Sequence, residues 1–127
     1  MSGWGGTVTA MFVNHLRYAE VPFVNSQTCK ENWSRADEKH RLVVTKNMIC
    51  AGNNTRDACG GDSGGPLTCS VAGEDFLCGI VSYGTKCDWK HKKNSNPGIY
   101  TDVRKYYGWI RKHMQIYWRY YWSEFYN

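Results

Sequence analysis

The chain has 127 residues, a hydrophobic content of 42%, and 16 Lys and Arg against 11 Asp and Glu, which gives a net charge of +5. These values describe one folded unit and exclude a disordered chain or a multidomain array. No run approaches the roughly 18 apolar residues that a membrane-spanning helix needs, and the mean hydropathy is −0.59. Without a basic platform carrying aromatic side chains, the positive charge gives nucleic-acid binding no support.

Short apolar stretches separated by turn residues predict an all-β core with long loops. The glycines cluster between these stretches, where tight turns need a residue without Cβ. Only the end of the chain, from about Arg104 onward, shows the three- and four-residue apolar spacing of a helix. The predicted strands, in chain order, are 18–24, 42–44, 47–51, 66–71, 76–83 and 98–103.

The six cysteines lie between positions 29 and 87, and their even number predicts a disulfide framework made in an oxidising compartment. The nearest are nine residues apart, so the C-x-x-C spacing of a zinc site is missing and neither a metal nor a cofactor is expected. Two glycosylation sequons, Asn32-Trp33-Ser34 and Asn53-Asn54-Thr55, also point to the secretory pathway. The first residues do not resemble a secretion leader, and we therefore expect a secreted protein whose N-terminal part is missing from this chain.

The segment 57–66, DACGGDSGGP, carries the most chemical information. Glycines around Ser63 allow a tight turn that presents the hydroxyl outward, while the N–H groups of Gly61 and Ser63 converge on one point. Two such donors make an oxyanion hole, which stabilises the negative oxygen of an acyl-transfer intermediate.

The GDSGGP segment at 61–66 resembles the nucleophile motif of the chymotrypsin/trypsin family of serine endopeptidases. Further segments resemble the family in the same order, across residues 2 to about 113: SGWG at 2–5, NMICAG at 47–52, GIVSYG at 79–84, NPGIYTDV at 96–103 and YGWI at 107–110. The resemblance implies the second, C-terminal six-stranded antiparallel β-barrel of a trypsin-like double barrel, followed by an α-helix. Residues 1–113 would be this C-terminal part of the domain, and 114–127 an aromatic-rich helical extension.

By this resemblance Ser63 is the nucleophile, and its N–H forms the oxyanion hole together with that of Gly61. Asp62 would be the carboxylate that pairs with a new N-terminal amine on activation. A simpler interpretation of Asp62 is a turn carboxylate that accepts a nearby N–H.

The resemblance also places Asp57 at the base of the primary specificity pocket, where a buried carboxylate recruits Arg or Lys from the substrate. The alternative is an acid on a surface loop. Ala58 lacks the hydroxyl of some relatives, which favours Arg over Lys. Small residues would form the pocket walls, and an extended substrate would pair with the backbone as an added strand. The residues for these two roles are Gly84 and Gly98 for the walls, and Ser82, Tyr83 and Gly84 for the strand.

Two cysteine pairs follow from the resemblance, Cys29–Cys50 and Cys59–Cys87. Cys69 departs from the family pattern, because its usual partner lies upstream of SGWG, and Cys78 is an uncommon addition. Residues 70–77 are typical of a hairpin connection, so Cys69 and Cys78 are expected to bond across it.

A serine nucleophile needs a base, but the family's histidine motif and buried aspartate belong to the first barrel. The four histidines, His15, His40, His91 and His113, lie in no such motif. We therefore expect the C-terminal half of a secreted endopeptidase that cuts after Arg or Lys, inactive without its missing N-terminal barrel. The alternative is a non-catalytic, protease-like binding module.

A basic loop at the rim of the expected pocket could bind a polyanion or steer acidic substrates. A solvated charged loop is the simpler interpretation. Its cations are Lys86, Lys90, Lys92 and Lys93.

Overall fold

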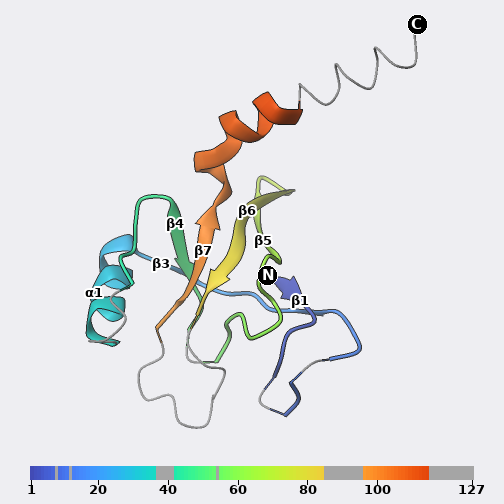
Figure 1. Cartoon of the computed structure of the whole chain (residues 1–127). Coiled ribbons are helices and arrows are strands. Elements are labelled where there is room, and N and C mark those ends of the chain that lie inside the picture. Colours follow the sequence, from blue (N-terminus) through green and yellow to red (C-terminus); the bar gives the residue numbers. More distant parts are fainter. Residues whose placement is uncertain (8, 12, 37–41, 54, 85–95, 115–127) are drawn as a thin grey trace, which may run out of the picture.

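The computed structural model describes residues 1–7, 9–11, 13–36, 42–53, 55–84 and 96–114. In this part of the chain, seven strands form two antiparallel sheets, β1–β2 and the five-stranded sheet β3-β4-β7-β6-β5 (Figure 1). The strands are β1 (Ser2–Gly3), β2 (Arg17–Tyr18), β3 (Phe23–Val24), β4 (Met48–Ala51), β5 (Pro66–Val71), β6 (Glu74–Tyr83) and β7 (Gly98–Asp102). The helices are α1 (Ser26–Ala36), the short 3-10 helix η1 (Val103–Tyr106), and a C-terminal helix described over 107–114.

The strand predicted over 18–24 is split into β2, which ends at Tyr18, and β3, which begins at Phe23. Pro22 lies in the interruption and has no N–H to donate to a ladder, although its carbonyl accepts the N–H of Gly52 at 2.9 Å. Counted as one interrupted strand, β2 and β3 join both sheets into six consecutive strands. Closing these strands into a barrel would need a ladder between the end strands β1 and β5, and the described residues form none.

Helix α1 is absent from the sequence-based prediction, which was wrong to place helix only at the end of the chain. The Asn25 side chain caps α1 by accepting the N–H of Gln27 at 2.8 Å. Among the residues of α1 whose burial is described, 26–35, only Cys29 and Trp33, one turn apart, are buried. That strip is too narrow to give a strong helical period in the sequence.

The strand predicted over 42–44 is wrong. This segment has no ladder partner in the described residues, and its apolar character serves side-chain packing instead. Val44 is 6% exposed and packs with Cys29 and Trp33, whereas Val43 is 72% exposed. Alternating burial therefore arises here without a β-ladder.

The core lies on both sides of the five-stranded sheet in two clusters. The cluster beneath α1 is tied by the Cys29–Cys50 disulfide, with an S–S distance of 2.04 Å, and by a 3.0 Å hydrogen bond from the Trp33 indole to the carbonyl of Pro97. The other cluster packs β4, β5, β6 and β7 around Tyr100. Its buried members are Ile49, Ala51, Leu67, Cys78, Val81 and Tyr100.

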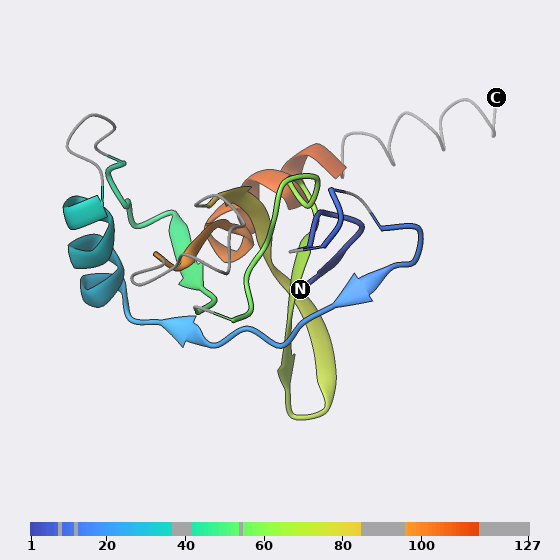
Figure 2. The same cartoon turned by 90° about the horizontal axis from the view of Figure 1, so that it is seen from below.

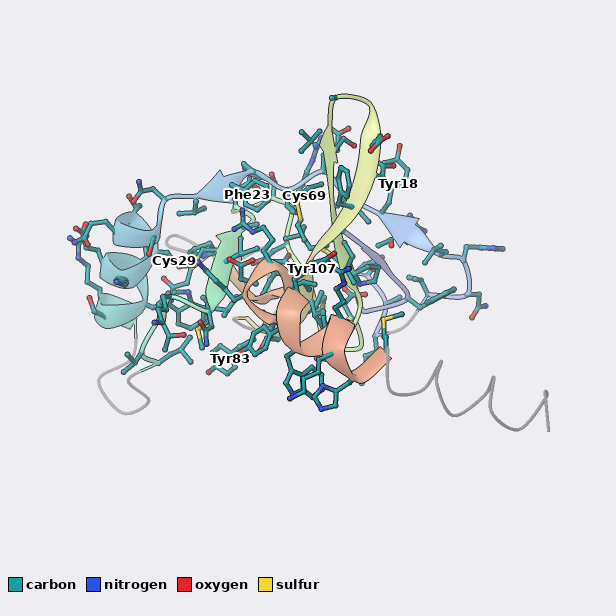
Figure 3. All side chains as sticks on the ribbon, turned by 90° about the horizontal axis from the view of Figure 1, so that it is seen from above. Tyr18, Phe23, Cys29, Cys69, Tyr83 and Tyr107 are labelled. Atoms are coloured by element: carbon teal, nitrogen blue, oxygen red, sulfur yellow. A yellow bond between two sulfur atoms is a disulfide. The ribbon has the colours of Figure 1, made fainter. Side chains whose placement is uncertain are left out.

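The β5–β6 hairpin projects from the body of the molecule (Figure 2). Ala72 and Gly73, both with positive φ, form its two-residue turn, as hairpin twist requires. A register shift between Leu67 and Thr68 lets Cys78 reach Cys69, although Phe76 is the residue directly opposite Cys69. These two cysteines form the disulfide that the hairpin pattern predicted, and Figure 3 shows it well separated from Cys29.

The C-terminal helix, drawn in orange, extends away from the sheet (Figure 1). It confirms the predicted helix after Arg104 as far as residue 114, and the rest of the helical extension predicted over 114–127 lies outside the described residues. None of the helices in the described ranges is both long enough and apolar enough to cross a membrane.

Candidate functional site

The loop that carries Ser63 consists of two consecutive turns between the end of the 57–59 segment and the start of β5. The N–H of Asp62 donates to the carbonyl of Cys59 at 3.0 Å, and the N–H of Gly65 donates to the carbonyl of Asp62 at 2.8 Å. Gly61 has a φ of 97° and Gly64 a φ of 79°, which L-residues with a Cβ rarely adopt. Ser63 lies exposed between these two glycines.

The backbone N–H groups of this loop divide into two sets. Those of Asp62, Gly64 and Gly65 donate to carbonyls of the fold. The N–H groups of Gly61 and Ser63, on either side of Asp62, have no acceptor among the described residues. Two donors that bond to none of the residues described therefore accompany the exposed serine hydroxyl, which is the donor pattern an oxyanion needs.

The Asp62 carboxylate is held beneath the serine loop. The residue is 8% exposed, and its two oxygens accept the N–H groups of Gly5 at 2.8 Å and Cys59 at 3.0 Å. A Cβ on Gly3 would lie 2.0 Å from Oδ1 of Asp62, and one on Gly5 would lie 2.4 Å from the same carboxylate. The glycines of the SGWG segment thus make the space that this carboxylate occupies.

The Asp57 carboxylate lies against two glycines from different strand ends. Its Oδ1 accepts the N–H of Ala58 at 2.8 Å. An added Cβ would lie 2.3 Å from this oxygen at Gly98 and 2.8 Å from it at Gly52. Gly98 therefore makes room for the acid at the base of the predicted pocket, a role that the sequence pattern did not indicate.

Tyr100 is a further site residue that the sequence reasoning missed. The residue is fully buried at 0% exposure. Burial raises the pKa of its phenol above the ordinary value, and the negative charges of Asp57 and Asp62 raise it further. The available signal was the alternation of β7, which places residue 100 on the same face as Gly98.

A cavity of about 490 Å³ lies on the side of these acids that faces β1 and β2. Asp57 and Asp62 both contribute to its lining, together with Gly3, Gly5 and Arg17. The carboxylates of Asp57 and Asp62 thus face the same cavity as the two-stranded sheet β1–β2.

The end of β6 provides an edge beside the serine loop. Pairing with β5 runs only to the Pro66–Ile80 pair, whereas β6 continues to Tyr83. A Cβ added at Gly84 would lie 4.0 Å from the carbonyl oxygen of Ala58, which is an ordinary van der Waals distance. Tyr83 is 47% exposed (Figure 3).

No histidine in the described part of the chain bonds to the Ser63 hydroxyl. His15 is exposed, and Nδ1 of His113 lies 2.8 Å from the carbonyl of Trp109 on the same helix. The residues described also contain no group of three or more His, Cys, Asp or Glu placed to hold a metal ion. Predicted positions outside the described residues are His40, Lys86, Cys87, Lys90, His91, Lys92 and Lys93.

Cys59, at the start of the serine loop, is disulfide-bonded. Its predicted partner, Cys87, is one of the positions outside the described residues, so that pairing stays a prediction.

Comparison of the sequence with known proteins finds similar segments in complement and coagulation proteins. Complement C1s-1 subcomponent of Mus musculus is 41% identical over 123 residues, covering 91% of this chain and 17% of that protein. Mannan-binding lectin serine protease 1 of Mus musculus is 39% identical over 88% of the chain and 15% of its own length. Coagulation factor XII of Bos taurus is 39% identical over 89% of the chain and 18% of its own length.

The chain thus spans less than one fifth of the length of these relatives. The family model described as Trypsin matches residues 1–110, which is most of the chain and includes the serine loop, Asp57 and β7. The chain belongs to the trypsin family of serine proteases.

Proposed function

We propose that Ser63 is the nucleophile of a serine endopeptidase, and that the N–H groups of Gly61 and Ser63 form its oxyanion hole. The observation that carries this proposal is a pair of N–H donors on either side of Asp62, next to an exposed hydroxyl, that have no acceptor in the described part of the chain. When Oγ attacks a peptide carbonyl, the carbonyl oxygen gains negative charge. Preorganised N–H donors stabilise that charge without the cost of reorienting solvent.

Asp57 supports a preference for Arg or Lys before the cut bond. Its carboxylate lies beside Gly52, which follows β4, and Gly98, which begins β7. It also accepts the N–H of Ala58. A guanidinium or ammonium group that reaches this position meets a fixed negative charge in a partly buried setting, where charge-assisted hydrogen bonds are strong. Glycine at position 84 places no side chain opposite the carbonyl of Ala58, where a Cβ would already be in van der Waals contact.

The edge of β6 beyond Val81 suits substrate binding by strand addition. Val81 itself already exchanges two backbone hydrogen bonds of 2.9 Å with Gly64 and Gly65. An extended peptide beside residues 82–84 would pair with the backbone there, in the manner of an added strand. Such pairing would place the residue before the cut bond near Asp57 and its carbonyl near Ser63.

The chain alone should hydrolyse peptides negligibly. Attack by a serine hydroxyl requires a base to take its proton, and no described histidine contacts Ser63. A base supplied by another segment of a longer, secreted protein would complete the site. In that protein, Asp62 would accept an N-terminal ammonium entering the 490 Å³ cavity, which both acids line.

Binding of an arginine mimic tests the pocket separately from catalysis. Benzamidine, a planar aryl cation, should bind the 127-residue chain in calorimetry, and Asp57→Asn should weaken that binding at least tenfold. Glu74→Gln removes an exposed carboxylate on the β5–β6 hairpin and is the matched control. Equal binding by Asp57→Asn and the unaltered chain would overturn the pocket assignment.

Catalysis is tested on a longer protein that contains this chain, with peptide substrates carrying Arg, Lys or Phe before the cut bond. Cleavage should follow Arg and Lys, and Ser63→Ala should lower kcat by more than about 1,000-fold. Preferred cleavage after Phe, or activity that survives Ser63→Ala, would contradict the proposal.

A further inference from the structure

The two glycosylation sequons, far apart in the sequence, meet at one groove. Asn32 on α1 and Asn53 after β4 both line a hollow of about 490 Å³, with Thr55 and Pro97 also at its walls. A sugar is attached to the side-chain amide nitrogen of an asparagine, so that nitrogen must be accessible. The surroundings of Asn32 and Asn53 differ in this respect.

The Asn53 side chain closes a local turn through its oxygen alone. Its Oδ1 accepts three hydrogen bonds of 2.9 Å, from the N–H and the Oγ1 hydroxyl of Thr55 and from the N–H of Arg56. The N–H of Asn53 in turn donates to the carbonyl of Arg56 at 2.9 Å. All four contacts join residues 53, 55 and 56, so local hydrogen bonds close this Asx turn.

The Asn53 amide nitrogen takes no part in that turn. The residue is exposed, and Nδ2 has no hydrogen-bond partner among the described residues. Attaching a sugar to Nδ2 leaves Oδ1 an amide oxygen with its acceptor capacity intact. The turn can therefore persist with the glycan in place.

Asn32 is placed differently, inside helix α1. It is only partly exposed, and the next residue, Trp33, is 4% exposed with its indole bonded to the carbonyl of Pro97 at 3.0 Å. The Ser34 hydroxyl donates to the carbonyl of Glu31 at 2.8 Å and not to Asn32. A bulky glycan here would compete with the packing that holds α1 against the sheet.

We propose that Asn53 is the N-glycosylation site of this protein and that Asn32 is not modified. In the reaction, Nδ2 loses one proton and bonds to the anomeric carbon of an oligosaccharide carried on a lipid pyrophosphate. The bond between that carbon and the pyrophosphate oxygen breaks, and the lipid pyrophosphate leaves. The glycan then covers the groove between α1 and the 52–56 loop.

This inference rests on the secretory location proposed above, and the experiment separates the two. The full chain is translated in the presence of microsomes behind an appended secretion leader, and protease protection identifies the translocated molecules. Delivery is thus supplied, so the result reports on the asparagines and not on the natural route of secretion.

Translocated chain should lose one glycan on digestion with an N-glycosidase, seen as a single mobility shift. Asn53→Gln and Thr55→Ala should abolish the shift, whereas Asn32→Gln and Thr55→Ser should retain it. An unshifted wild-type chain, or a shift that survives Asn53→Gln, would overturn the assignment of Asn53. A second glycan that is lost in Asn32→Gln would overturn the exclusion of Asn32.

Discussion

Replacing Asp62 by asparagine tests how the serine loop is held. The carboxylate accepts two backbone N–H groups, from Gly5 and Cys59, on different oxygens. An asparagine amide has one oxygen, so it can satisfy one donor while its NH2 group faces the other. The substitution loses one charge-assisted hydrogen bond and leaves a buried donor unpaired, which together cost about 3 kcal/mol. That is a large part of a typical folding free energy of about 5–15 kcal/mol.

Urea unfolding of the 127-residue chain, followed by tryptophan fluorescence, measures this loss. With a slope of about 1–3 kcal/mol per M, a 3 kcal/mol change lowers the midpoint by about 1–3 M. Glu74→Gln, on the exposed hairpin, changes the net charge equally and should leave the midpoint in place. If Asp62→Asn lowered stability by less than about 0.5 kcal/mol, the two N–H contacts would not be what anchors the loop.

Three further substitutions address other parts of the molecule. Gly98→Ala places a Cβ 2.3 Å from Oδ1 of Asp57, so it should cost about 1–3 kcal/mol in urea unfolding and weaken benzamidine binding; unchanged binding would contradict the contact. Trp33→Phe removes a buried 3.0 Å hydrogen bond and should lower the free energy of unfolding, measured by thermal unfolding, by about 1 kcal/mol. An unchanged free energy would contradict a stabilising role for this bond. The hydrogen bonds and charge of Arg104 lower the pKa of Asp102, so its stabilising effect is present above the unfolded pKa of about 3.9 and is lost as pH falls through the folded pKa. Asp102→Asn should therefore flatten the acid limb of a stability–pH curve, and an unchanged limb would contradict this.

The β-ladders around the site were largely predictable because their strands combine β-branched residues with turn signals at both ends. The β5–β6 hairpin and β7 lie close to their predicted limits. The sequence-based prediction was wrong for α1, which it missed, and for 42–44, which it assigned to a strand. In both segments only a few separate side chains are buried, and these do not form a continuous face. One buried cluster contains Cys29 and Trp33 from the helix and Val44 from the segment beside it. Such contacts between distant segments leave no regular spacing of apolar residues in the sequence.

The conformation of the serine loop follows from the residues within it. Its turns close through hydrogen bonds between residues three apart, and Gly61 and Gly64 permit the positive φ values that these turns require. The surroundings of that loop depend instead on contacts between distant segments. Gly5 lies 57 positions from the carboxylate that its N–H binds, and Gly98 makes room for an acid on another segment. The reason is physical: a turn is set by the torsion angles of adjacent residues, whereas the space left by an absent Cβ matters only when folding brings another chain segment to fill it.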